Sequence, residues 1–273
     1  MSRSILVVLL LLSSTVAAAE EVMLPRTTVQ RISAEANGID YKLYVSLPRD
    51  YATSRARYPV IYLLDADYSF AIAHNVVEHL ADRGQLPWAI VVGIAYDGAP
   101  QYRMHRTRDY TPTRTLDLTG VPAHQQPYQK YTGGGPKFRE FLAAELVPLI
   151  DRTYRTTRER VLVGHSYGGL FAAWMLLTTP DVFTGYVAIS PSLWYDERLA
   201  FRTPPSAAMR GRVYLAAGAM ENPIMGNDVR ELTARLRKSK TITVRGEVME
   251  GETHDSIVPG AFSRGVRWVL NGR

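Results

Sequence analysis

Residues 164–169, Gly-His-Ser-Tyr-Gly-Gly, join a short run at 160–163, which is apolar after Arg160, to a longer, mostly apolar stretch at 170–179. Such runs are typical of a buried strand followed by a helix. A serine on the sharp turn between them has a strained backbone that pushes its hydroxyl outward, so the positions two before and two after it need glycine. The helix N-terminus adds a positive field that favours an anionic intermediate. The motif predicts that Ser166 is a nucleophile; a glycine-rich turn that only permits close packing is the alternative.

Strand-like and helix-like segments alternate along the rest of the chain. Strands are expected at 39–47, 59–64, 88–94, 160–163, 185–190, 213–217 and 241–248, and helices at 70–84, 138–154, 167–179, 228–238 and 256–270. This alternation predicts an α/β fold with a mainly parallel sheet, helices on both faces, and reactive groups at the carboxyl ends of strands. A polar stretch rich in proline and glycine, 97–135, is expected to be a long loop.

The N-terminal residues do not fit this alternation. Arg3 precedes an unbroken apolar run at 5–12, and a run of three alanines ends at Ala19. This arrangement is typical of a secretory signal peptide, residues 1–19, because the apolar run is too short to span a bilayer; an uncleaved anchor is the alternative. Cleavage near Ala19 would leave a single domain, 20–273, in the periplasm of a Gram-negative cell, with no stable membrane insertion.

Composition excludes several classes of site. The chain has no cysteine, so an exported domain would depend on its hydrophobic core and would have no disulfide, thiol nucleophile or lipoprotein attachment site. Its histidines lack the spacings typical of metal sites, and we predict neither a metal nor an organic cofactor. The net charge of +6 weakly favours anionic ligands, and no motif typical of nucleic-acid binding is present.

The general base is expected to follow the serine, because this is the order of catalytic groups around the same turn in α/β-hydrolases. Of the six histidines, only His254 follows Ser166. It lies just after the expected strand 241–248, at the carboxyl edge of the sheet. Because histidine can take a proton from a serine hydroxyl near neutral pH, we predict that His254 is the base. A surface-loop histidine is the alternative.

An acid that orients the base should lie between the serine and the histidine. Glu221 follows the expected strand 213–217 and is the preferred candidate. Asp228 is a rival, although it also fits as a first-turn acid of the next helix. Asp255 would have to fold back to reach the ring of the adjacent histidine. A dyad without any acid also stays open.

The oxyanion of the intermediate needs backbone donors. The expected donors are the N–H of Tyr167 and an N–H from the loop after strand 59–64, for which we choose Asp67.

Together these segments resemble the putative-esterase family of the α/β-hydrolase superfamily, which includes feruloyl esterases, the esterase D group, mycolyltransferases and siderophore trilactone esterases. The resemblance covers nearly all of residues 28–272. It is carried by Tyr-Leu-Leu-Asp at 62–65, Arg-Thr-Arg-Asp-Tyr-Thr-Pro at 106–112, Thr-Gly-Gly-Gly at 132–135 with Phe138, the serine motif at 164–169, Ser-Pro-Ser-Leu-Trp at 190–194, and Gly-Glu-Thr-His-Asp at 251–255.

The resemblance implies an α/β-hydrolase fold with Ser166 as nucleophile, His254 as base and Glu221 as acid. Some trilactone esterases look like dyads, so the acid stays open. The usual Leu-Leu-Asp-Gly of the family is Leu-Leu-Asp-Ala here, so the chain departs from the family pattern at Ala66, in the loop expected to supply the second oxyanion donor.

The combination of export signal, Arg-x-Arg-Asp, serine motif and Ser-Pro-Ser-Leu-Trp is similar to periplasmic siderophore esterases. Between positions 101 and 139 there are seven basic residues, two acidic ones and four tyrosines. Cationic and aromatic walls would suit a ferric tris-catecholate, an aromatic trianion. We therefore expect Arg106, Arg108 and Trp194 to contact the substrate. A solvated loop whose arginines pair with surface acids, and a tryptophan buried in the core, are the alternatives.

The leading hypothesis is a serine carboxylic-ester hydrolase that forms an acyl-enzyme and opens the trilactone of a ferric catecholate siderophore of the enterobactin type. A feruloyl, aryl or short-chain carboxylesterase is the second. An acyltransferase to a sugar or lipid hydroxyl would use the same residues. A siderophore-binding protein without activity is disfavoured, because the serine, histidine and turn glycines are all intact.

Overall fold

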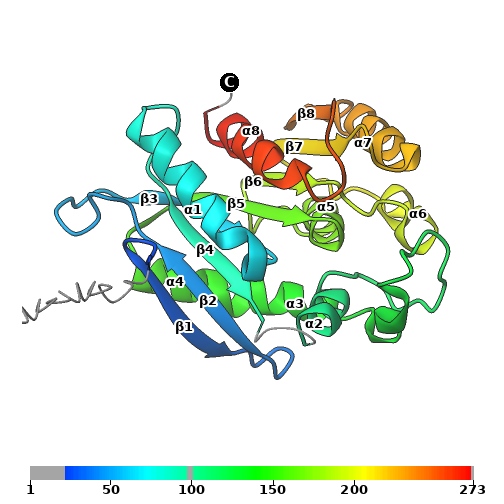
Figure 1. Cartoon of the computed structure of the whole chain (residues 1–273), viewed down its shortest axis with the longest axis horizontal. Helices are drawn as coiled ribbons and strands as arrows, with labels where there is room; N and C mark the ends of the chain where they lie inside the picture. Colours follow the sequence, from blue (N-terminus) through cyan, green and yellow to red (C-terminus); the bar gives the residue numbers. More distant parts are fainter. Residues whose placement is uncertain (1–21, 97–100, 272–273) are drawn as a thin grey trace, which may run out of the picture.

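The computed structural model describes residues 22–96 and 101–271. The signal peptide expected over residues 1–19 lies outside this part and stays a prediction. The described chain is built around one eight-stranded sheet with helices packed on both faces (Figure 1).

The strands lie in the order β1-β2-β4-β3-β5-β6-β7-β8. Their bounds are β1 (Thr27–Ser33), β2 (Asp40–Ser46), β3 (Tyr58–Leu63), β4 (Ile90–Ala95), β5 (Thr156–His165), β6 (Gly185–Ile189), β7 (Gly211–Gly218) and β8 (Ile242–Met249). Strand β2 is antiparallel to both of its neighbours, β1 and β4, and the strands β4-β3-β5-β6-β7-β8 are all parallel to one another. The predicted α/β class and mainly parallel sheet are confirmed.

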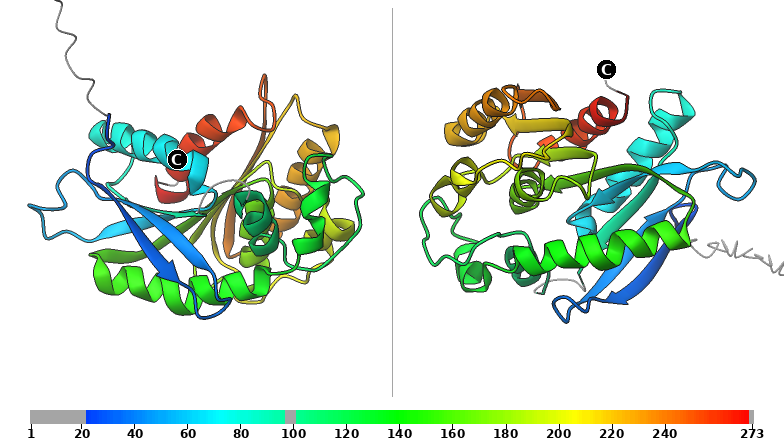
Figure 2. Two further views of the ribbon diagram at one scale, coloured as in Figure 1. Left: turned by 60° about the horizontal axis from the view of Figure 1, so that its bottom comes forward. Right: turned by 180° about the vertical axis from the view of Figure 1, so that it is seen from behind.

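The helices form two layers. Their bounds are α1 (Ala66–Asp82), α2 (Gln101–Asp109), the 3₁₀ helix η1 (Gln126–Tyr131), α3 (Gly135–Glu140), the π-helical turn η2 (Phe141–Leu146), α4 (Val147–Thr153), α5 (Tyr167–Thr178), α6 (Tyr195–Arg202), α7 (Pro223–Leu236) and α8 (Ile257–Asn271). Helices α1 and α8 pack together on one face of the sheet, and α3 to α5 and α7 cover the other (Figure 2).

The central strands are buried on both faces. Along β3, Ile61 and Leu63 pack toward α1 and α8, while Val60 and Tyr62 pack toward the helices of the opposite layer. All six residues of β3 are buried. This explains why its sequence is continuously apolar rather than alternating. Two cores on one rigid sheet fix the positions of the loops at its carboxyl edge.

The stretch expected to be a long loop contains two helices within its described part, α2 and η1. Helix α2 was not predicted because it has no apolar stripe. Its buried positions are Arg106, Thr107 and Asp109, which are buried through ion pairs and hydrogen bonds. Hydrophobic periodicity cannot detect such a helix. The exposed edge strand β1 and the short helix α6 were also missed.

Candidate active site

Ser166 lies on the turn between β5 and α5 with φ 59° and ψ −117°, a conformation that non-glycine residues rarely adopt. A Cβ at Gly164 would lie 2.2 Å from the carbonyl oxygen of Gly168, so this position excludes any side chain. At Gly169 a Cβ would lie 3.0 Å from the carbonyl oxygen of Ile189, and at Gly168 the nearest atom would be 3.3 Å away, on Asp65. The glycines therefore allow the backbone to close tightly beneath the serine, most strictly at Gly164.

His254 and Glu221 are brought together from the ends of β8 and β7. The Nδ1 of His254 lies 2.6 Å from Oε2 of Glu221. The other carboxylate oxygen accepts the hydroxyl of Ser190 at 2.5 Å and the N–H of Gly218 at 2.6 Å. Burial would raise the pKa of Glu221, but these three hydrogen bonds outweigh it and hold the pKa below its ordinary value. The ionised carboxylate thus holds a proton on Nδ1 and leaves Nε2 as the acceptor.

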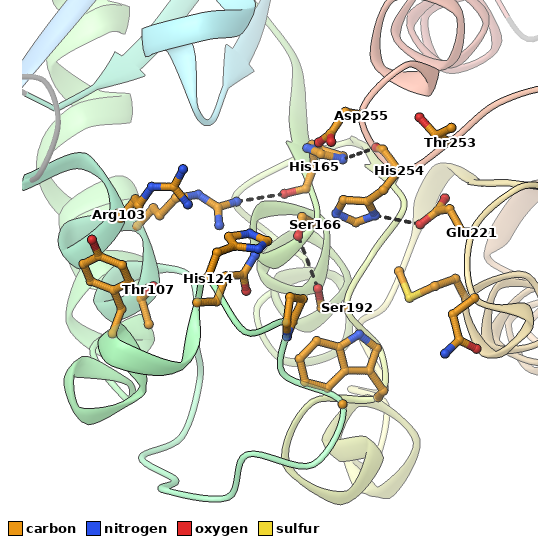
Figure 3. A pocket seen from close by; sticks show the side chains of 18 of the residues that line it. Arg103, Thr107, His124, His165, Ser166, Ser192, Glu221, Thr253, His254 and Asp255 are labelled. Carbon is orange, nitrogen blue, oxygen red and sulfur yellow. Dashed lines mark hydrogen bonds and ion pairs between the residues drawn. The ribbon is translucent and has the colours of Figure 1, made fainter.

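Ser166 and His254 line the same cavity, which has a volume of about 780 Å³. Figure 3 shows the imidazole of His254 between Ser166 and Glu221. Among the described residues, the hydroxyl of Ser166 is hydrogen-bonded to the hydroxyl of Ser192, at 3.4 Å, and not to His254. Catalytic hydrogen bonds are often long without substrate and tighten when it binds, so this arrangement is compatible with proton transfer to Nε2.

The other acid candidates are not joined to the base. Asp228 is buried on α7 and pairs with Arg198 at 2.8 Å, and burial raises its pKa. The cap of α7 is instead Asn222, which accepts the N–H of Ile224. Asp255 is exposed at the rim of the cavity. Of the three carboxylates weighed from the sequence, the structure pairs only Glu221 with His254.

Of the two predicted oxyanion donors, Tyr167 lies next to Ser166, whereas Asp67 lies in the first turn of α1. Tyr167 is the first residue of α5, where backbone N–H groups have no partner within the helix, so its N–H is available next to Ser166. Asp67 does not line the cavity, and its carboxylate accepts the N–H of Tyr96 at 2.9 Å. The choice of Asp67 assumed a loop after β3, whereas α1 already begins at Ala66 and carries Asp67 in its first turn.

Arg106 borders the cavity, but its charge is already neutralised. Its Nε and Nη2 donate to the carboxylate of Asp65 at 2.9 and 3.0 Å, and both side chains are buried. Burial by itself would lower the pKa of Arg106, but Asp65 and Tyr102 raise it well above its ordinary value. Arg106 lines the cavity, so its contact with substrate stays a prediction, while the ion pair with Asp65 gives its guanidinium a structural role.

Arg108 does not line the cavity. It forms two hydrogen bonds with Asp109, at 2.7 and 3.0 Å, and the same carboxylate accepts the hydroxyls of Tyr41 and Tyr96. The structure therefore gives no support to the prediction that Arg108 contacts substrate.

Trp194 lines the cavity, as predicted. The cavity has one exposed arginine that the sequence argument did not single out, Arg103, for which the structure records no ion pair among the described residues. Arg103 lies one turn before Arg106 in α2. A prediction of this helix from the sequence would have placed the two arginines on the same side of it. Ser192, whose hydroxyl lies 3.4 Å from that of Ser166, belongs to the Ser-Pro-Ser-Leu-Trp segment at 190–194, but the sequence argument gave it no role.

The described residues contain neither a metal-binding cluster nor a membrane-spanning helix. No cluster of three or more histidine, cysteine or acidic side chains in residues 22–96 and 101–271 could hold a metal ion. No helix within those ranges is both long and apolar enough to cross a bilayer.

Comparison with known proteins gives consistent matches. A sequence model described as "Putative esterase" matches residues 34–269. The ferri-bacillibactin esterase BesA of Bacillus subtilis (strain 168) is 34% identical over 266 residues, which is 91% of this chain and 91% of that protein. The crystal structure of the BES protein from Bacillus cereus superposes with a TM-score of 0.82 at 26% identity, covering 93% of this chain and 99% of that one. An IroE-like serine hydrolase from Shewanella oneidensis gives a TM-score of 0.78 at 28% identity, over 90% of this chain and 80% of that one.

The two cavity arginines are expected to differ in their effect on stability. Arg106→Gln leaves the buried carboxylate of Asp65 without its partner and should lower the free energy of unfolding by about 3–5 kcal/mol. Arg103→Gln changes an exposed residue and should stay within about 0.5 kcal/mol of the parent chain. Urea unfolding of both variants measures the difference. Equal, small losses would contradict a structural role for Arg106.

Proposed function

Since the chain belongs to the putative esterase family and is a carboxylic ester hydrolase, we propose that it hydrolyses the ester bonds of siderophores through a covalent intermediate on Ser166. The observation that carries the proposal is the arrangement of three groups around one cavity. A serine on a strained turn faces the imidazole of His254, and that imidazole is held by the buried carboxylate of Glu221 at 2.6 Å.

The proposed first half-reaction forms an acyl-enzyme. Ser166 Oγ attacks the ester carbonyl carbon while its proton passes to Nε2 of His254. Glu221 stabilises the imidazolium through the Nδ1–H hydrogen bond. The N–H of Tyr167, at the positive end of α5, donates to the oxyanion. The intermediate collapses when the ester C–O bond breaks and His254 returns its proton to the departing alkoxide.

The second half-reaction repeats these roles with water. His254 takes a proton from a water molecule, whose oxygen attacks the acyl carbonyl carbon. When the bond to Ser166 Oγ breaks, His254 protonates this oxygen, and the free acid leaves. The enzyme returns to its starting protonation state, and no metal or organic cofactor takes part.

The lining of the cavity supports a bulky, aromatic and anionic substrate. A volume of about 780 Å³ lies in the upper part of the usual range for ligand pockets. Tyr68, Tyr102, Tyr128 and Trp194 supply aromatic surface, and Arg103 supplies a positive charge. A ferric catecholate siderophore with a trilactone ring, of the enterobactin type, has this chemistry. The similarity to a ferri-bacillibactin esterase supports the same class.

The catalytic roles predict distinct losses of activity. Ser166→Ala should lower kcat on p-nitrophenyl butyrate by roughly 10⁴-fold or more, because no other group can form the acyl-enzyme. Glu221→Gln should lower it by about 10³–10⁴-fold, because the amide no longer fixes the histidine tautomer. Asp228→Asn serves as the control and should stay within about threefold of the parent enzyme per folded molecule. Undiminished hydrolysis by Ser166→Ala would remove the nucleophile assignment.

The substrate class predicts a preference that kinetics can measure. The value of kcat/KM should be at least about tenfold higher for ferric enterobactin than for methyl ferulate. Arg103→Gln should lower kcat/KM on ferric enterobactin by about tenfold and leave methyl ferulate unchanged, because only the former is a trianion. Equal values for the two esters in the parent enzyme would reject the siderophore and favour an aryl esterase.

Export to the periplasm is part of the proposal and rests on the N-terminal sequence pattern. The protein recovered from a periplasmic extract of a Gram-negative host should begin at Glu20, as measured by mass spectrometry of its N-terminal peptide. Recovery of the full-length chain from the cytoplasmic fraction alone would contradict export.

A further inference from the structure

The residue immediately before the serine, His165, is buried and has both ring nitrogens hydrogen-bonded. Its Nε2 lies 2.7 Å from the backbone carbonyl oxygen of His254, and its Nδ1 lies 2.9 Å from the hydroxyl of Tyr68. A carbonyl oxygen can only accept a hydrogen bond, so Nε2 carries the proton. Nδ1 must then accept the hydroxyl proton of Tyr68. The two contacts define one tautomer of a neutral ring.

The ring stays neutral over the range in which esterases work. Burial, followed by the neighbouring imidazole of His254, lowers the pKa of His165 to about 4, although Asp65 acts in the opposite direction. Because its one acceptor nitrogen is already occupied by Tyr68, His165 cannot take a proton from the serine. It is therefore no second base, even though it borders the same cavity.

The contact joins two parts of the site that are far apart in the sequence. The ring of His165 belongs to the turn that carries Ser166, and its partner is the peptide group of His254 itself. The two imidazole rings lie 4.6 Å apart between centroids (Figure 3). The backbone of His165 is also fixed, because its carbonyl oxygen accepts Nη2 of Arg106 at 3.4 Å. A well-anchored residue thus reaches across to the loop that carries the base.

The loop that carries His254 needs such an anchor. Residues 250–256 follow β8 with mostly exposed side chains. On the side of β7 the loop is held by the backbone N–H of Met220, which donates to the carbonyl of Glu252 at 2.9 Å. On the side of the nucleophile, the hydrogen bond from His165 holds the peptide of His254.

We propose that His165 is a positioning residue, which sets the distance between Ser166 Oγ and His254 Nε2 by donating its Nε2–H to the carbonyl oxygen of His254. This inference rests on the proposed function, in which His254 transfers the proton in both half-reactions. Without the hydrogen bond from His165, the imidazole of His254 would no longer be held in place, and both acylation and deacylation would slow. A misplacement of about 1 Å can lower a rate by about 10²-fold. KM should change little, because neither nitrogen of His165 is free to bind substrate.

A matched pair of variants tests this role. His165→Gln and His165→Met have side chains of similar length and differ in whether they can donate a hydrogen bond. Per active site, kcat on p-nitrophenyl butyrate should fall by about 10–100-fold in His165→Met and by less than about fivefold in His165→Gln. KM should stay within about twofold in both. Active sites are counted by stoichiometric labelling with a p-nitrophenyl phosphonate, in which Ser166 Oγ forms a P–O bond and p-nitrophenolate leaves.

Counting active sites by phosphonate labelling separates a positioning role of His165 from general damage to the fold. If His165→Met loses labelled sites but keeps the parent kcat per labelled site, the ring is merely structural and the inference is overturned. Equal kcat values for the two variants, or a change in KM alone, would also overturn it. If the parent enzyme itself is not labelled at Ser166, the proposed function fails, and this outcome is distinct from all the others.

Discussion

The buried ion pair between Asp65 and Arg106 connects the parts from which the site is built. Asp65 lies between β3 and α1, as the N-cap residue of α1, and Arg106 comes from α2, a helix with almost no apolar residues of its own. The carboxylate also accepts the hydroxyl of Tyr102 and lies against Gly168, and the guanidinium reaches the carbonyl of His165. Because a buried charge is stable only with its partner, this pair fixes the cavity wall against the serine turn.

The groups for the chemistry and the surface for recognition come from different parts of the chain. Ser166, Glu221 and His254 follow β5, β7 and β8, whose positions are set by two hydrophobic cores. Much of the cavity wall comes from α2 and the residues up to Tyr128, which belong to no strand. In the proposed mechanism, the sheet therefore positions the reacting groups, while the segment beside it selects which esters reach the serine.

The features predicted best from the sequence were those that depend on apolar periodicity or on steric exclusion of a side chain. The buried strands and the turn at Ser166 followed from continuous apolar runs and from glycines that admit no Cβ, and strand ends pointed to His254 and Glu221. Charged residues were interpreted poorly, because a sequence shows a charge but not its partner. Arg106 and Arg108 looked free and are paired, and the same ion pairs concealed α2 from hydrophobic periodicity. The choice of Asp67 as the second oxyanion donor assumed a loop, whereas α1 begins at Ala66, three residues after β3 ends at Leu63.

The position of α2 and η1 between β4 and α3 has an evolutionary consequence. This segment lines the cavity around the serine yet contributes nothing to the pairing of strands, so it can change in length and composition without altering the register of the sheet. Arg106 limits this variation, because any replacement segment must still supply a cation that pairs with the buried carboxylate of Asp65. Homologous enzymes can therefore acquire new ester preferences by exchanging a single surface segment, provided that one cation is retained.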